Sequence, residues 1–402
     1  MTRPVPPSEG DAVIARTGLY SVLLLLLTAC GGSGGGSDTA ASAPEPEPDI
    51  TDPRCLADSD GPNWQALAEV NCPRLSQYQL FSDGRDPRVG PIGPGLPFAP
   101  ASGLFSDHAT KYRFVFLPEG STAQYRDTFG LVFPVGTVMV KTFALPVSAA
   151  GGDDRLMETR LLIHRASGWV GLPYQWQADG QDATLARTGK VIDTYVMVDG
   201  VQQDFRYQIP DVLTCRKCHQ GRTDNEVMTP LGTTVRQLNH DFPYVGGAKN
   251  QLVYWQENGM LADAPAPASW PRAVDWHDTS EPLDLRVRSY LDTNCSHCHS
   301  DVGSGALSGL RLEMWRDPTD YIYGICNRAQ GYYGGPLGLT YDIVPGNAAD
   351  SVLPFRQGAQ RHTDNAKDMM PPLGRSLADH DAVALVRQWI DAMPAKACAT
   401  LD

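Results

Sequence analysis

The sequence predicts an α+β protein with several domains: a β-rich, sandwich-like domain first, then a short helical segment, then an all-α domain. Between residues 51 and 210, apolar and polar residues alternate with a period of two, for example in 111–116 and 137–143. This alternation is typical of strands. After residue 281 the apolar residues recur with the spacing of helices instead.

A hairpin is the clearest element of the β-rich part. Two strand-like stretches, 194–198 and 201–209, flank the dipeptide Asp199-Gly200. Asp-Gly supplies the positive φ angles that a two-residue turn between antiparallel strands requires. We therefore expect the β-rich domain to end near Pro210, and nothing in its residues demands catalysis.

Helices are expected in the second half of the chain. Two short ones are predicted at 233–239 and 248–259. A longer one ends at Cys295, and another begins at the capping box Ser376-x-x-Asp379. The apolar faces of the longer pair are Val287, Tyr290 and Leu291 in the first, and Leu385, Val386, Trp389 and Ile390 in the second.

One five-residue pattern, Cys-x-x-Cys-His, occurs twice, at 215–219 and at 295–299. Two thiols at this spacing can add across the two vinyl groups of one porphyrin, and the histidine that follows can place its imidazole under the iron. The pattern therefore predicts two covalently bound haem c groups. Together with the flanking helices, the second motif suggests a cytochrome c fold for the C-terminal domain. The expected attachment sites are Cys215, Cys218, Cys295 and Cys298, and the expected proximal iron ligands are His219 and His299.

A zinc site made from two Cys-x-x-Cys knuckles is the alternative. The motifs begin at residues 215 and 295, 80 positions apart, whereas paired zinc knuckles usually lie closer together. Zinc also gives no reason for a histidine to follow both knuckles. We therefore favour haem.

Met370 is the predicted sixth ligand of the second haem. It lies in the segment 369–374, Met-Met-Pro-Pro-Leu-Gly, which cannot be helical because of its prolines. A thioether ligand stabilises ferrous iron and raises the reduction potential, as an electron carrier requires. Met369 is the alternative ligand, and packing of Met370 in a loop is the alternative role.

The sixth ligand of the first haem is less defined. Met228 begins the segment 228–232, Met-Thr-Pro-Leu-Gly, which resembles the Met370 segment, while His240 and Met260 also lie downstream of the motif. If none of them coordinates, the first iron has an open position and could bind peroxide, nitric oxide or hydroxylamine. The remaining histidines are expected in surface or core roles: His108, His164, His277, His362 and His380. His297, between the two cysteines of the second motif, needs no role beyond filling that loop.

The first 30 residues resemble a bacterial lipoprotein signal peptide. Arg3 and Arg16 precede an apolar run, 19–29, that is too short to span a membrane and ends before Cys30. Small residues before this cysteine fit cleavage there and lipid attachment to Cys30. A simple secretory signal that is cut near Ala29 is the alternative.

A flexible tether is expected at 31–50, because the segment is rich in Gly and Ser and then in Ala, Pro and Glu. Gly31 directly after Cys30 resembles lipoproteins that are sorted to the outer membrane. We therefore expect an exported, lipid-anchored protein at the outer membrane, facing the periplasm, with the cell surface as the alternative.

Two disulfides are expected from the four cysteines that neither haem nor lipid uses. Four cysteines allow three connectivities. We favour Cys55–Cys72 and Cys326–Cys398, because each pair lies in one expected domain, and an oxidising compartment makes disulfides more common than free thiols.

The chain carries a formal net charge of −13, so nucleic acid is not an expected partner. A proline- and alanine-rich stretch, 262–271, resembles an interdomain linker. The expected organisation is a signal peptide (1–30), a tether (31–50), a β-rich domain (51–213), a first haem-binding segment (214–280) and a cytochrome c domain with the second haem (281–402).

The C-terminal part resembles the cytochrome domain of a family of two-haem c-type lipoproteins of Gram-negative bacteria, most of them uncharacterised. The resemblance rests on 295–299, 309–312, 341–346, 370–372 and 389–390, and it extends to 133–137, 158–161, 237–239 and 250–252. It implies the same haem attachment and the same proximal histidines, but no substrate.

Segment 136–141, ahead of the first motif, has a fainter resemblance to hydroxylamine-oxidising c-type cytochromes, in which the haem is crosslinked to a lysine. It would give this role to Lys141, although a lysine in a strand is usually only solvated.

Three functions remain open. The favoured one is transfer of single electrons between donor and acceptor proteins. The second is a haem enzyme, a peroxidase or an oxidase of a small nitrogen compound, with the first haem as the catalytic centre. The third is a redox subunit that docks on another protein through its β-rich domain. Di-haem peroxidases are a poor match, since here a large β-rich part precedes both motifs.

Overall fold

The computed structural model describes residues 52–83, 85–148, 154–219, 228–332, 334–361, 364 and 367–398. The expected signal peptide, the lipidation site Cys30 and the tether lie outside these residues. Residues 48–402 cluster as one compact unit. Within the described part, no helix combines the length and the apolar character that crossing a bilayer would require.

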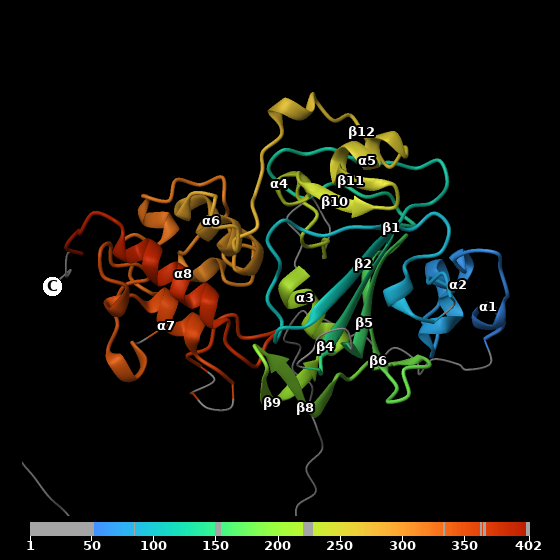
Figure 1. The fold of residues 1–402 in the computed structure, drawn as a ribbon, viewed down its shortest axis with the longest axis horizontal. Coiled ribbons are helices and arrows are strands. Elements are labelled where there is room, and N and C mark those ends of the chain that lie inside the picture. Colours follow the sequence, from blue (N-terminus) through green and yellow to red (C-terminus); the bar gives the residue numbers. More distant parts are fainter. Residues whose placement is uncertain are drawn as a thin grey trace, which may run out of the picture. The chain divides into compact units, whose positions relative to one another are not determined.

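A six-stranded antiparallel sheet is the centre of the fold, with strand order β1-β2-β4-β5-β6-β7 (Figure 1). Its strands are β1 (Leu96–Pro97), β2 (Thr110–Phe116), β4 (Val138–Pro146), β5 (Asp154–Arg165), β6 (Gly168–Trp176) and β7 (Ala183–Leu185). Successive side chains point to opposite faces, so the alternation in 111–116 and 137–143 places two different sets of residues on the two faces.

One face of the sheet packs against an N-terminal cap. The cap consists of α1 (Pro53–Leu56), α2 (Trp64–Glu69) and two 3₁₀ helices, η1 (Leu75–Tyr78) and η2 (Pro87–Val89). Leu67 and Tyr78 of the cap share a core with Leu161 and Tyr174 of the sheet. The Arg165 guanidinium fastens the cap by donating hydrogen bonds to the Leu67 and Val70 carbonyls.

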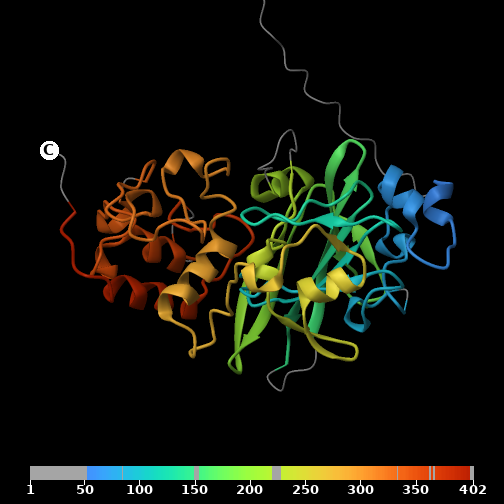
Figure 2. The ribbon, with the colours of Figure 1, turned by 90° about the horizontal axis from the view of Figure 1, so that it is seen from above.

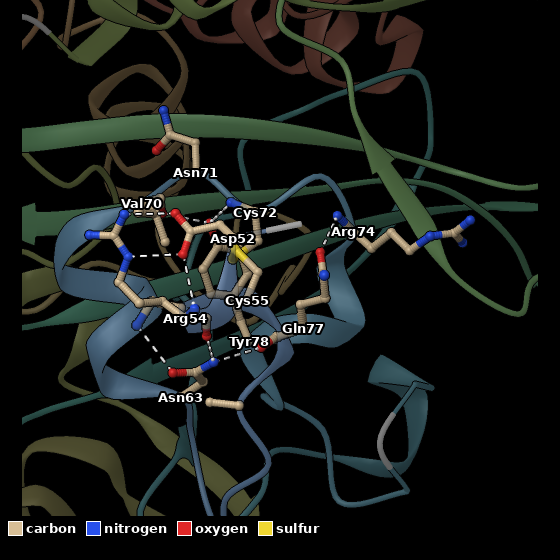
Figure 3. The surroundings of a disulfide bond; sticks show 12 residues. Asp52, Arg54, Cys55, Asn63, Val70, Asn71, Cys72, Arg74, Gln77 and Tyr78 are labelled. Atoms are coloured by element: carbon tan, nitrogen blue, oxygen red, sulfur yellow. Dashed lines mark hydrogen bonds and ion pairs between the residues drawn. A yellow bond between two sulfur atoms is a disulfide. The ribbon is translucent and has the colours of Figure 1, made fainter. Parts of the chain in front are cut away.

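The disulfide Cys55–Cys72 closes this cap (Figure 3). Asn63 accepts a hydrogen bond from the backbone N–H of Ala66 and so caps α2, while the Tyr78 hydroxyl accepts one from the N–H of Cys72. The second disulfide, Cys326–Cys398, lies in the C-terminal part. Both are pairings that the sequence analysis favoured.

The hairpin prediction is confirmed. Strands β8 (Lys190–Val198) and β9 (Val201–Ile209) pair in an antiparallel ladder around Asp199 and Gly200, whose φ angles are 50° and 77°. The hairpin packs on the second face of the sheet, where Val196 and Phe205 share a core with Phe143.

The middle of the chain covers the rest of this second face. It contains α3 (Val212–His219), α4 (Val235–Leu238), a small hairpin of β10 (Asp241–Tyr244) and β11 (Gly247–Asn250), and α5 (Gln251–Glu257). The predicted helix at 248–259 therefore begins three residues late, because its start pairs as a strand. Strand β12 (Leu261–Ala262) pairs in parallel with β3 (Ala123–Gln124). After it, η3 (Pro267–Ser269) leads to Trp270, which is buried in one core with Leu261 and Ala123. The segment 262–271 is therefore more than a linker.

The C-terminal part contains α6 (Leu283–Asn294), α7 (Val352–Gly358) and α8 (His380–Asp391) (Figure 2). The faces predicted for α6 and α8 meet, with Tyr290 and Leu291 in one core with Val386 and Ile390. Four 3₁₀ helices interrupt the long connections: η4 (Ala306–Ser308), η5 (Tyr321–Tyr323), η6 (Gly335–Leu337) and η7 (Ala348–Asp350).

The predicted fold class is wrong. Helices make up 25% and strands 26% of the structure. Among the residues that the structure describes, one large antiparallel sheet replaces the expected sandwich, and the C-terminal part is not an all-α domain. Alternation identifies strands but not the number of layers, and helices and hairpins cover the second face instead of another sheet. In the C-terminal part, isolated bridges such as Ile325 to Ile343 and Arg328 to Tyr341 join the loops between the helices.

Candidate functional site

Helix α3 presents the first Cys-x-x-Cys-His motif to the second face of the sheet. Asp211 begins the helix, since its carboxylate accepts the backbone N–H of Thr214 at 2.7 Å. Cys215 then packs against Gly171 of β6, where an added Cβ would lie 3.3 Å from the Cys215 Cβ and 3.5 Å from the Cε of Met228. Only glycine at 171 allows the motif to lie this close to the sheet without displacing its neighbours.

The tautomer of His219 is fixed by its surroundings. The Nδ1 atom lies 2.8 Å from the carbonyl oxygen of Thr229, which can only accept a hydrogen bond. The proton is therefore on Nδ1, and Nε2 keeps the lone pair that coordinates a metal. Burial lowers the pKa of His219 to about 4, so the ring is neutral at ordinary pH.

The second motif follows the C-terminus of α6, and His299 has the same arrangement. The Ser308 hydroxyl donates to the Gly305 carbonyl at 2.7 Å, so its oxygen is free to accept from His299 Nδ1 at 3.1 Å. Nε2 of His299 again keeps its lone pair. Burial lowers the pKa of His299 to about 4 as well.

Each motif lines its own cavity. The first cavity, of about 590 Å³, is bounded by the second face of the sheet and by Cys215, Cys218, His219 and Met228. The second, measured in the same way, is much smaller, about 70 Å³, and is lined by Cys295, Cys298, His299 and Met370. Both cavities thus bring two thiols, a neutral imidazole and a thioether to one space, which is the donor set of a c-type haem.

The alternative ligands lie elsewhere. Met369 is 1% exposed and does not line the second cavity, whereas Met370 does. Nε2 of His240 lies 2.9 Å from the Ala99 carbonyl oxygen and does not reach the first cavity. Met260 packs in the core beside Trp255. Among the sequence candidates for the first haem, Met228 is therefore the one placed at the cavity.

A zinc site receives no support from the structure. Among the described residues, no group of three or more histidine, cysteine, aspartate and glutamate side chains is arranged to hold a metal ion. A haem iron does not need such a group, because the porphyrin supplies four of its ligands.

The two motifs meet in space. The thiols of Cys218 and Cys298 are neighbours, close enough that each shifts the pKa of the other. Three residues line both cavities: Asn294, His297 and Pro371. His297 is 9% exposed, and its Nδ1 has no hydrogen-bond partner within the described residues. The sequence analysis gave His297 no particular role, and no local signal could have shown that it separates the two cavities.

A buried ion pair holds the motifs in place. Nε and Nη2 of Arg236, on α4, each donate to the carboxylate of Asp292 at 2.8 Å, and Asp292 lies three residues before Cys295. On the other side, the Asn294 side chain accepts the N–H of Phe105 at 2.7 Å. The first contact joins α4 to α6, and the second joins the segment between β1 and β2 to α6.

Comparison with known proteins assigns no family. No family model matches the chain, and no solved structure matches it. A local match of 78 residues is 33% identical to an acetate kinase of Acaryochloris marina, and it covers 19% of this chain and 19% of that protein. A match confined to about a fifth of either chain leaves the family open.

Proposed function

We propose that this protein is a two-haem c-type cytochrome that transfers single electrons between redox proteins outside the cytoplasm. The observation that supports it best is the meeting of the two Cys-x-x-Cys-His motifs. The thiols of Cys218 and Cys298 interact with one another, and His297 lines both cavities. Two attachment sites this close together suit electron exchange between their cofactors.

The residues fit haem c at both sites. Bound haem would supply reversible one-electron chemistry. In this proposal Cys215, Cys218, Cys295 and Cys298 hold the two porphyrins. His219 and His299 present Nε2 to the iron atoms, each oriented by the hydrogen bond at Nδ1.

Met370 and Met228 are the proposed sixth ligands. Each lines the cavity of its own motif. Met370 is also held by its backbone, since the Arg375 guanidinium donates to its carbonyl at 2.7 Å and its N–H donates to the Arg356 carbonyl at 2.9 Å. A thioether held in this way favours ferrous iron and a raised potential.

Export and lipid anchoring through Cys30 are part of the proposal. The two disulfides are consistent with an oxidising compartment. The resemblance to two-haem lipoproteins of Gram-negative bacteria supports the outer membrane as the site of anchoring and the periplasm as the compartment.

A haem enzyme with the first haem as its centre is the second candidate. The first cavity favours it, because that cavity is large and lined by the cationic side chains of Arg113, Lys141 and Arg160. In this second candidate function, the second haem passes the electrons from the first haem to an acceptor. A crosslink between Lys141 and the first haem remains a proposal of the same kind.

Mass spectrometry of the mature protein tests the haem content. Two covalent haem increments and a Soret band support the proposal, and their absence after expression with haem-maturation proteins contradicts it. A redox titration with carbon monoxide then separates the candidates. A carrier should bind little carbon monoxide at either reduced haem, whereas rapid binding at the first haem favours the enzyme.

A further inference from the structure

Three cationic side chains form a row across the second face of the sheet. Arg113 on β2 lies directly opposite Lys141 on β4, and Lys141 lies directly opposite Arg160 on β5. All three line the first cavity. Like charges directly opposite one another on neighbouring strands repel, so the row costs stability unless a negative charge offsets it.

Arg160 has a counter-ion of its own. Its guanidinium donates two hydrogen bonds to the Glu158 carboxylate, at 2.9 and 2.5 Å. The same carboxylate accepts from the Tyr207 hydroxyl at 2.6 Å, which fixes it in place. The charge of Arg160 is therefore largely balanced.

Arg113 and Lys141 have no such partner. Within the described part of the chain, no carboxylate or other acceptor forms a hydrogen bond with either side chain, and both are half-buried. The contact recorded for the Lys141 ammonium is with the ring of Phe143, at 4.7 Å from the centroid. Because neither side chain is hydrogen-bonded to a carboxylate, burial lowers the pKa of Arg113 to about 10 and the pKa of Lys141 well below its usual value. A bound anion would favour the protonated, cationic form of both groups.

The row faces the attachment end of the cavity. The attachment residues Cys215, Cys218 and His219 line the same cavity as the row. In haem c the thioether edge and the propionate edge are on opposite sides of the porphyrin. Cations near the attachment cysteines and the proximal histidine are therefore better placed for an anion near the iron than for the propionates.

We propose that Arg113, Lys141 and Arg160 form a binding site for a small oxyanion or carboxylate beside the first haem. The inference rests on the proposed function for the presence of that haem. Haem propionates have the same chemistry and are the other source of negative charge that this row could accept.

Anion titration of the mature protein tests the proposal. Sodium nitrite and sodium formate are added while the optical spectrum and the midpoint of thermal unfolding are followed. We expect a saturable spectral change at one haem and a rise in the midpoint. Arg113→Gln and Lys141→Gln should weaken anion binding about tenfold or more, while Lys141→Arg, which keeps the charge, should retain most of it.

Lys249→Gln is the matched control. It removes one positive charge from an exposed pair with Glu257, away from the cavity, and should leave anion binding unchanged. Circular dichroism of each variant checks that the fold is kept.

Each outcome decides the proposal. If the anions have no effect, but Arg113→Gln and Lys141→Gln lower the potential of one haem, the row binds propionates and the small-anion site is ruled out. Equal anion binding in the variants and the unaltered protein, or no change in binding and potential, overturns the proposal altogether. A protein without covalent haem would contradict the proposed function, while the thermal response to nitrite would still show whether the row binds anions.

Discussion

The thiol of Cys218 lies beside the thiol of Cys298, although the two residues are 80 positions apart. Each is the second cysteine of its motif. Cys218 is held against the sheet by α3, and Cys298 follows α6. The relative position of these two elements therefore determines the separation of the two proposed cofactors. Contacts of α6 with α4 and with the segment between β1 and β2 control it.

The buried pair of Arg236 and Asp292 is the strongest of these contacts. Breaking it by Arg236→Ala or Asp292→Ala should destabilise the protein by about 3–5 kcal/mol, because the remaining charge stays buried without a partner. Urea denaturation of each single variant and of the double variant measures this. The double variant should lose less free energy of unfolding than the two single variants together. A loss equal to their sum would show that the two side chains are not coupled.

The pair of Arg236 and Asp292 should also make the stability of the protein depend on pH in the acid range. Burial alone would raise the pKa of Asp292, but the charge and hydrogen bonds of Arg236 outweigh it and lower the pKa below its usual value. The stabilisation is therefore present above the ordinary pKa of an aspartate, near 3.8, and is lost as the pH falls through the lower value of the folded state. Asp292→Asn should flatten the stability profile in that acid range.

Asp107 should give the opposite dependence of stability on pH. Its carboxylate accepts the N–H groups of Ser376 and Leu377 at 2.6 and 2.7 Å, and burial raises its pKa to about 6. The unfolded chain releases this proton near pH 3.8, so stability should fall as the pH rises from about 4 to 6. Asp107→Asn keeps an acceptor oxygen and should stabilise the protein by about 1–3 kcal/mol at pH 7. Denaturant unfolding at pH 4 and pH 7 checks this, with the exposed Asp58→Asn as control; an unchanged slope with pH would contradict it.

Met370→Ala should lower the reduction potential of one haem and leave the other unchanged. A thioether ligand favours ferrous iron, and its loss removes that preference. Met369→Ala is the matched control, because Met369 is buried beside it but does not line the cavity. It should reduce stability without moving either potential. A spectroelectrochemical titration distinguishes the two, and equal potentials in Met370→Ala and the unaltered protein would remove Met370 from the ligand set.

Asp342 should make the potential of the second haem depend on pH. It lines the second cavity, and burial raises its pKa to about 7, while the positive charge of Arg356 and the hydrogen bond from Asn327 oppose the rise. Above that pH the carboxylate is negative and stabilises ferric iron, so the potential should fall as the pH rises through 7. Asp342→Asn should abolish this dependence. A potential that varies with pH to the same extent in the variant would assign the effect to another group.

Local features could be predicted from the sequence, and features that depend on distant contacts could not. The Asp199-Gly200 hairpin, the apolar faces of α6 and α8 and the Cys-x-x-Cys-His motifs are contained in short segments, so their residues suffice to predict them. The preferred disulfide pairs followed from assigning each pair to one part of the chain.

The number of layers and the contact between the motifs depend on what covers each face of the sheet. The row of Arg113, Lys141 and Arg160 depends on the register of three strands, since each residue alone resembles an ordinary surface charge. The position of His297 between two cavities arises only when the β-rich part docks on α6.

The meeting of Cys218 and Cys298 has a consequence for biogenesis. In the proposed cytochrome, both are free thiols side by side until haem is attached, and an oxidising compartment would readily join them. One wrong sulfur–sulfur bond would then block both proposed porphyrin sites at once. Under this proposal the order of assembly matters: at least one of the two cysteines would have to carry its porphyrin before the chain closes around them, while Cys55, Cys72, Cys326 and Cys398 form their disulfides.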